Sequence, residues 1–489
     1  MRARTGLRIE ETARLADQVN GVIRETIPKE EIATLLDNIG LPYSGINLSY
    51  SNAGTIGTSD AEILVQLKEE RGKSTTGYIN DLRQRLPQEF PGVQFFFQPA
   101  DIVTQILNFG TPAPIDVEIT GINQRGNYLV GEKLAAQIRH IPGAVDVHVH
   151  QAFDNPTLFM EIDRARAQSV GMQSRDVAQN VLVSLSSSFQ TSPAFWLDPK
   201  NGVEYSVAVQ EPQYRMDSYQ ALQNTPISGS APGAAPQILG NLVQTRTTTR
   251  PAEVSHYTSV PMINVYAAVD GRDLGSVADQ VEQRVAAVEK NGLPPGSHIL
   301  VRGQVQTMKN SFEGLGFGLL GAIILAYLLI VVNFQSWLDP FIIITALPGA
   351  LAGICWMLLL TRTTLNVPSL TGAIMCMGVA TANSILMVSF AREQMDEGKG
   401  AREAALEAGF VRIRPVLMTA LAMIIGMVPM ALGLGEGGEQ NAPLGRAVIG
   451  GLLFATFATL FFVPCVFSMI HGRRARRPGH EPPPEPVAA

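Results

Sequence analysis

Five long apolar runs after Phe312 constrain the fold of this chain more than any other feature. They contain no Asp, Glu, Lys, Arg or His. Each has about the 17 to 25 apolar residues that a helix needs to cross the hydrocarbon layer of a membrane. The predicted spans are Leu315–Val332, Pro340–Leu360, Val367–Phe390, Pro415–Leu434 and Ala447–Ile470. We therefore expect an all-α bundle of five transmembrane helices within residues 312–471.

Lys and Arg in the connections predict the orientation of the spans. The connection between the third and fourth spans holds five of them: Arg392, Lys399, Arg402, Arg412 and Arg414. Basic residues gather on the cytoplasmic side of membrane helices. We therefore expect a cytoplasmic C-terminus with a disordered tail at 472–489, and the region before Phe312 on the outer side. No apolar signal segment opens the chain, so we expect a missing upstream helix to carry this region across.

The region before Phe312 alternates short strands with amphipathic helices, which predicts small α+β units of the split βαβ, ferredoxin-like type. The first unit is expected at 1–113 and the second at 114–163 and 261–305. An insertion at 164–260 is richer in Ser, Gln, Gly and Pro and is expected to form a separate lobe. The predicted strands are Ile32–Asn38, Ala61–Leu67, Val93–Phe97, Asp116–Thr120, Ala144–His150, Leu158–Ile162, Met262–Val269 and His298–Val301. The predicted helices include Tyr78–Leu86, Tyr128–His140 and Val277–Glu289.

Composition excludes some function classes. The formal net charge is −6, which argues against a basic nucleic-acid binder. The three cysteines all lie in the apolar runs, so we expect no disulfide framework and no CxxC metal pair. No nucleophile elbow, phosphate loop or zinc motif indicates an enzyme.

Four motifs stand at separate places along the chain. They are Gly-Leu-Arg-Ile-Glu-Glu-Thr at 6–12, Phe-Gln-Ser-Trp-Leu-Asp-Pro at 334–340, Gly-Val-Ala-Thr-Ala-Asn-Ser-Ile-Leu at 378–386 and Arg-Ile-Arg-Pro-Val-Leu-Met-Thr at 412–419. With them the chain resembles the C-terminal half of a resistance-nodulation-division (RND) efflux permease, in the hydrophobe/amphiphile branch. The resemblance covers nearly the whole chain except its Pro-rich tail.

The resemblance implies a proton-driven multidrug efflux permease of the Gram-negative inner membrane, with its N-terminal domain in the periplasm. Such permeases are homotrimers that act with a periplasmic adaptor and an outer-membrane channel on small amphiphilic substrates, without a cofactor. The units at 1–113 and at 114–163 and 261–305 would be the third and fourth porter subdomains. The lobe at 164–260 would be the docking lobe, and the spans would be helices eight to twelve.

A missing N-terminal half would supply the protonated carboxylates, so this chain is expected to be active only with that half. Three alternatives to that function remain open. A truncated fragment without transport activity, or an assembly subunit, is the main alternative. Heavy-metal efflux is less favoured, because the front region shows no methionine cluster suited to a soft metal.

The resemblance also implies a proton relay within the membrane. Arg412 and Thr419 match relay positions on the eleventh helix, and seven residues of spacing put them on one helix face. Asn383 lies in the tenth-helix motif, where Ala382 replaces the Lys that is usual in drug exporters, so proton coupling itself is in question. The alternatives are a membrane-surface anchor formed by Arg412 with Arg414, and small polar residues that only pack helices.

The connection at Asn52–Thr58 matches the glycine-containing switch loop of the family. Gly54 and Gly57 would act as hinges, and Tyr50 is the nearby aromatic side chain. A plain hairpin turn is the alternative reading. This loop is the candidate substrate-binding or switch element of the soluble part.

Two other patterns receive simple structural interpretations. Phe95, Phe96 and Phe97 alternate along a strand and are expected mainly to fill a core. Asp146, His148 and His150 share one strand face, but a fourth metal ligand is not evident, so we expect a solvated face rather than a metal site.

Glycine and proline in the spans predict close helix contacts and bends. Pro348 and Pro429 are expected to bend their helices. Small residues let helix backbones approach one another closely. The glycines concerned are Gly349, Gly353, Gly372, Gly378, Gly426, Gly450 and Gly451.

Overall fold

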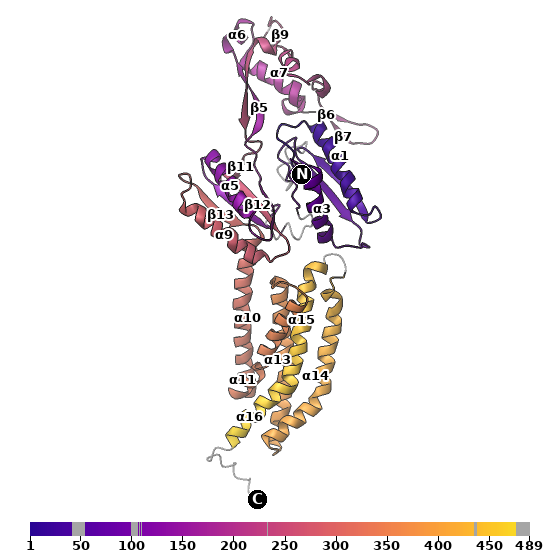
Figure 1. Cartoon of the computed structure of the whole chain (residues 1–489), viewed down its shortest axis with the longest axis vertical. Coiled ribbons are helices and arrows are strands. Elements are labelled where there is room, and N and C mark those ends of the chain that lie inside the picture. The colour runs from indigo at the N-terminus through magenta and orange to yellow at the C-terminus, as the bar shows by residue number, and fades with distance from the viewer. Residues whose placement is uncertain are drawn as a thin grey trace.

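The computed structural model describes residues 1–41, 54–98, 106, 108, 110–231, 233–434 and 438–475. The molecule is elongated (Figure 1). A helical bundle formed by the C-terminal residues occupies one end, two α/β units lie side by side above it, and a smaller lobe stands at the far end. The mixed α/β region followed by five apolar helices confirms the expected fold class at that level.

The first α/β unit packs two helices on a two-stranded antiparallel sheet. Its elements are α1 (Ile9–Thr26), β1 (Ile32–Ile39), β2 (Ala61–Leu67) and α3 (Thr75–Glu89). The expected strand at Val93–Phe97 is wrong, because only Gln94 forms an isolated bridge, with Arg2. Phe95 and Phe97 still pack on the core of this unit, as predicted. Phe95 and Phe97 therefore share one side of this segment, as expected, although the segment is not a regular strand.

The second unit is a five-stranded antiparallel sheet covered by two helices. Its elements are β3 (Ile115–Thr120), α5 (Gln124–Ile138), β4 (Ala144–Val149), β11 (Ser255–Tyr257), β12 (Val260–Val269), α9 (Leu274–Lys290) and β13 (His298–Arg302). The path β11-β12-β3-β13 forms the sheet, and β4 also pairs with β12. Ile115, Val117 and Ile119 are fully buried against the helices. The alternate residues of β3 are polar and lie on the opposite face.

The lobe is joined to the second unit by a long two-stranded ribbon. β5 (Asn155–Ile162) pairs with β10 (Val243–Arg250) along its whole length. The strand predicted at Leu158–Ile162 is confirmed, but its partner belongs to the insertion rather than to the sheet of the second unit. The remaining elements of the lobe are α6 (Arg164–Ser169), α7 (Ser174–Ser186), β6 (Ala194–Leu197), β7 (Glu204–Val207), α8 (Tyr219–Gln223), β8 (Pro226–Ile227) and β9 (Gln237–Ile238).

Five helical segments of the bundle are long and apolar enough to cross a membrane. They are α10 (Gln304–Phe334), α11 (Leu338–Ile344) with α12 (Leu347–Leu360), α13 (Val367–Asp396), α14 (Ala401–Ala431), and α15 (Gly438–Phe457) with η4 (Ala458–Phe462) and α16 (Val463–Ala475). Pro348 lies in the first turn of α12 and explains the break after α11. The η4 turn is π-helical.

The helices extend beyond the predicted spans at several ends. The second segment begins at Leu338 and includes Asp339, and α13 continues to Asp396. Arg392 and Arg412 therefore lie on helices rather than in a connecting loop. Window averages of hydropathy stop at the first charged residues, whereas a helix continues wherever its backbone hydrogen bonds are satisfied.

Candidate functional site

The three predicted relay residues lie along the contact between the antiparallel helices α13 and α14. Thr419 Oγ1 is 3.4 Å from Asn383 Oδ1 and 3.0 Å from the carbonyl oxygen of Val416, so its one hydrogen serves one of these acceptors. The guanidinium of Arg412 lies 4.9 Å from the ring centroid of Phe390. Arg412 is seven residues before Thr419 on α14, and Phe390 is seven residues after Asn383 on α13. The structure thus brings the predicted residues onto one seam.

One nitrogen of the Arg412 side chain has no hydrogen-bond partner within the described part of the chain. This atom, Nε, is buried. The contact with the Phe390 ring stabilises the charge but leaves that N–H group unsatisfied. Arg414, two residues later, is exposed. The two arginines therefore differ in environment, and only Arg412 is aimed into the bundle.

The tenth-helix motif presents its side chains in different directions. Ala382 is exposed on the outside of this five-helix bundle, whereas Asn383 is 6% exposed and Ser384 is fully buried. Ser384 Oγ lies 3.1 Å from Thr459 Oγ1 on the fifth segment. Polar contacts thus reach from α14 through α13 to η4.

Sequence reasoning missed Thr459. It is fully buried in the π-helical turn η4, and π-turns inside α-helices are frequent at functional sites. One signal was available, since Thr459 is a polar residue within a long apolar run. Its partner on α13 lies 75 positions away, so spacing alone does not reveal the contact.

Only residues 54–58 of the predicted switch loop lie within the described part of the chain. Tyr50 lies outside the described residues. A Cβ atom at Gly54 would collide with the side chain of Gln98, whereas one at Gly57 would meet nothing within 4 Å. The carbonyl oxygen of Gly57 accepts a 3.2 Å hydrogen bond from the backbone N–H of Asp60. Gly54 therefore lies against the movable end of the Gln98 side chain, while Gly57 lies in an open turn.

Arginines connect the two α/β units, which the sequence did not indicate. Arg83 on α3 forms two hydrogen bonds with Asp146 on β4, at 2.8 and 3.2 Å, and lies 3.4 Å from Asp270. Arg2 binds both carboxylate oxygens of Asp60 and donates to backbone carbonyls at the end of β4. Because these groups are largely buried, the contacts fix how the units meet.

Asp146, His148 and His150 do not converge on a shared point. Asp146 is paired with Arg83, and its positive φ of 57° accompanies a register irregularity between β4 and β12. His148 stacks on Phe96 at 4.0 Å, and burial lowers the pKa of His148 to about 3. His150 lies 3.4 Å from Glu253. Among the described residues, no group of three or more His, Cys, Asp or Glu is placed to hold a metal ion.

A buried carboxyl group lies on the polar face of the second sheet. Asp116 is 1% exposed and both its oxygens lie 3.1 Å from Asn264 Nδ2. Burial raises the pKa of Asp116 to about 7, although the hydrogen bond from Asn264 opposes this shift. Gln151 donates to Asn264 Oδ1 at 2.9 Å. Asn264 thus satisfies a carboxyl group that would otherwise be costly to bury, and Gln151 orients the Asn264 amide.

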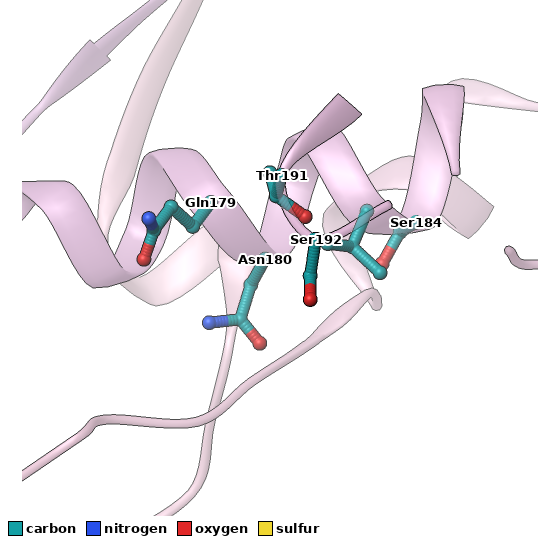
Figure 2. A pocket seen from close by; sticks show the side chains of 6 residues that line it. Gln179, Asn180, Ser184, Thr191 and Ser192 are labelled. Carbon is teal, nitrogen blue, oxygen red and sulfur yellow. The ribbon is translucent and has the colours of Figure 1, made fainter. Parts of the chain in front are cut away.

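A hollow of about 360 Å³ lies in the lobe beside α7 (Figure 2). Polar side chains line most of it. The Asn180 amide nitrogen is already bonded to the carbonyl oxygens of Asp176 and Ser228, at 2.8 and 2.9 Å. This hollow is distant from the membrane helices (Figure 1). The lining residues are Gln179, Asn180, Val183, Ser184, Thr191 and Ser192.

Five apolar helices beneath a large α/β region indicate a polytopic membrane protein. Residues 1–471 match the model of the AcrB/AcrD/AcrF family. The chain belongs to this family of RND permeases, which are multi-pass proteins of the inner membrane. The family assignment made from the sequence is confirmed.

Relatives and solved structures agree with this assignment. The nickel-cobalt-cadmium resistance protein NccA of Alcaligenes xylosoxydans xylosoxydans is 30% identical over 463 residues, which are 91% of this chain and 42% of NccA. The cobalt-zinc-cadmium resistance protein CzcA of Cupriavidus metallidurans is 28% identical, over 84% of this chain and 37% of CzcA. The swarming motility protein SwrC of Bacillus subtilis is 30% identical, over 65% of this chain and 30% of SwrC.

A crystal structure of a heavy metal efflux pump shows the same fold. Its TM-score is 0.79 at 23% identity, and the match covers 96% of this chain and 46% of that chain. This chain therefore spans less than half the length of the relatives that it matches. The names of these relatives do not support the expected hydrophobe/amphiphile branch.

Proposed function

We propose that this chain is the C-terminal half of a proton-driven RND efflux permease and transports only together with an N-terminal half. One observation carries the proposal most directly. The seam that contains Thr419 and Arg412 lies at an uncovered surface of the bundle, with Ala382 beside it exposed. A further helix that covers this surface would bring its own polar groups beside the half-buried guanidinium of Arg412 and the exposed Thr419.

The relay proposed on this seam uses three residues. Arg412 would supply positive charge to carboxylates of the other half, and Thr419 with Asn383 would hold a hydrogen-bonded path. Because Ala382 cannot act as a counter-ion, the charge of Arg412 becomes the main electrostatic partner on this side. Gly54, Gly57 and Tyr50 remain proposed as parts of a switch loop in the porter region.

The proposed assembly follows the family. The units at 1–113 and at 114–163 and 261–305 would be porter subdomains in the periplasm, and the lobe at 164–260 would dock on the outer-membrane channel. The C-terminus would be cytoplasmic. We propose a homotrimer that acts with a periplasmic adaptor. A fragment without transport activity is the alternative that the experiment below would reveal.

The proposed substrate class is divalent metal cations. NccA and CzcA match most of this chain, and their names refer to resistance to metals. These names favour divalent metal cations over the amphiphiles expected from the sequence motifs. Because less than half of each relative is represented here, the other half would contribute much of any substrate site. Small amphiphiles remain the second candidate and form the second arm of the test.

The test pairs the chain with its N-terminal half in inverted membrane vesicles. Proton-gradient-dependent uptake of Ni²⁺, Co²⁺ or Cd²⁺ is compared with uptake of an amphiphilic dye. Arg412→Ala should abolish gradient-dependent uptake, whereas the matched control Arg414→Ala should retain it. Equal uptake in the two variants would remove Arg412 from the relay. Uptake of neither substrate class by the paired wild-type halves would favour the inactive fragment.

A further inference from the structure

A buried carboxylate lies at the end of the bundle farthest from the porter region. Asp339 stands in the first turn of α11, and its side chain is 3% exposed. Ser336 Oγ accepts hydrogen bonds from the backbone N–H groups of Leu338 and Asp339, at 3.3 and 3.5 Å, and so orders this turn. A carboxylate this deeply buried is costly unless its oxygens are paired.

Both oxygens of Asp339 are paired with side chains from other membrane segments. Oδ2 lies 3.1 Å from Nη1 of Arg392 on α13, and Oδ1 lies 3.0 Å from Nε2 of His471 on α16. The His471 ring also packs on Phe467, with centroids 4.5 Å apart. The same Nη1 of Arg392 donates at 2.8 Å to the carbonyl oxygen of Phe334, the last residue of α10.

The carbonyl at Phe334 is one of the groups that a helix end leaves without an intrahelical partner. A cation at this end also interacts favourably with the helix dipole. The contacts of Asp339 and Arg392 therefore join α10, α11, α13 and α16 at one point. Within the part of the chain that the structure describes, these contacts do not reach α14, which carries Arg412 and Thr419.

We propose that Asp339, Arg392 and His471 form an ionic pivot that holds one end of four membrane segments together while their other ends change packing during transport. The contrast with the rest of the bundle supports this role. At the contact between α12 and α15, by comparison, the backbones approach closely at Gly353 and Gly450, and such small residues leave no polar group that fixes one arrangement. A carboxylate as deeply buried as Asp339 instead favours one arrangement, because separation from Arg392, whose side chain is 41% exposed, and from His471 would leave its charge unpaired. The functional part of the proposal rests on the proposed transport activity.

Distances between spin labels test the pivot without requiring transport. The full chain, with its three cysteines replaced, is reconstituted in lipid nanodiscs. One label pair is placed at the pivot end, at the exposed positions Val332 on α10 and Met469 on α16. A second pair at Phe317 and Leu365 reports on the opposite end. We expect a single narrow distance for the pivot-end pair in the otherwise unchanged chain.

Asp339→Asn should cause loss of the narrow distance at the pivot end, with little change in the second pair. The matched control is Asp396→Asn, because Asp396 is an exposed carboxylate near the same end of α13, and it should keep the narrow distance. If Asp339→Asn does not fold, Arg392→Gln and His471→Phe address the same contacts and should give the same loss. A narrow pivot-end distance that persists in all variants would overturn the proposal.

Transport measurements separate this proposal from the proposed function. With both halves present, Asp339→Asn should lose most proton-driven uptake while substrate binding is retained. Wild-type halves without any uptake would contradict the efflux function but leave the distance result standing. Normal uptake by Asp339→Asn with a broadened distance would show that a fixed pivot is unnecessary for transport, and would overturn its functional part.

Discussion

Replacing Gly353 by alanine tests whether the close contact between α12 and α15 controls the stability of the bundle. A Cβ atom at this position would lie 2.6 Å from Cβ of Phe454 and would also collide with the carbonyl oxygen of Gly450. Ordinary contacts begin at 3.4 Å, so the two helices must separate by roughly 1 Å in a close-packed interior. Overpacking of this kind costs about 1 to 3 kcal/mol.

The control for this variant is Gly378→Ala, because an added Cβ there meets nothing within 4 Å. Both changes gain the higher helix propensity of alanine, about 1 kcal/mol in water, so their difference isolates the steric cost. We expect Gly353→Ala to be less stable than Gly378→Ala by about 1 to 3 kcal/mol. Unfolding of each variant in mild detergent, followed by circular dichroism, measures this difference. Equal stabilities would refute the inferred contact.

Three further predictions concern other parts of the chain. Because burial raises the pKa of Asp116 to about 7, the folded state binds an extra proton between roughly pH 4 and 7, and stability should fall as pH rises through that window. Asp116→Asn should reduce this fall in thermal-melting experiments, and an unchanged slope would contradict the reasoning. Arg83→Ala should destabilise the α/β region by about 3 kcal/mol, because it leaves the buried carboxylate of Asp146 unpaired. Lys73→Ala, at an exposed pair, should cost below about 1 kcal/mol. Similar losses on chemical unfolding would argue against a fixed interface between the two α/β units. Thr459→Val should impair proton-driven uptake more than Thr456→Val, because Thr459 contacts Ser384 beside the proposed relay residue Asn383, whereas Thr456 bonds only within its own helix. Equal uptake would show that the Ser384–Thr459 contact does not support the proposed relay.

The membrane segments and many strands were predictable because their signals are local. A run of apolar residues long enough to span a bilayer needs no tertiary partner to be recognised. The strand predicted at Ala61–Leu67 agrees with β2 at both ends, and the helix predicted at Val277–Glu289 lies within α9. Strand Val93–Phe97 failed because a strand also needs a partner backbone, and Gln94 alone finds one.

The candidate site was only partly predictable. Arg412 and Thr419 share a helix face by spacing alone, and the motif around Asn383 indicated the second helix of the seam. Ala382 was expected to weaken the relay, but that it lies on the uncovered side of the bundle became evident only from helix packing. Thr459 was missed because it is recognised only through a contact with Ser384.

The amino-acid sequence alone indicated the family through its motifs, the five membrane segments through their length and composition, and the shared helix face of Arg412 and Thr419 through their spacing. Tertiary structure decided which polar groups meet. Asp339 and His471 are 132 positions apart, and Arg83 reaches Asp146 across two α/β units. A buried charge is stabilised by whichever partner the folded chain brings within about 3 Å, so the contacts of Asp339 and those between the two α/β units form only once the helices and sheets have packed.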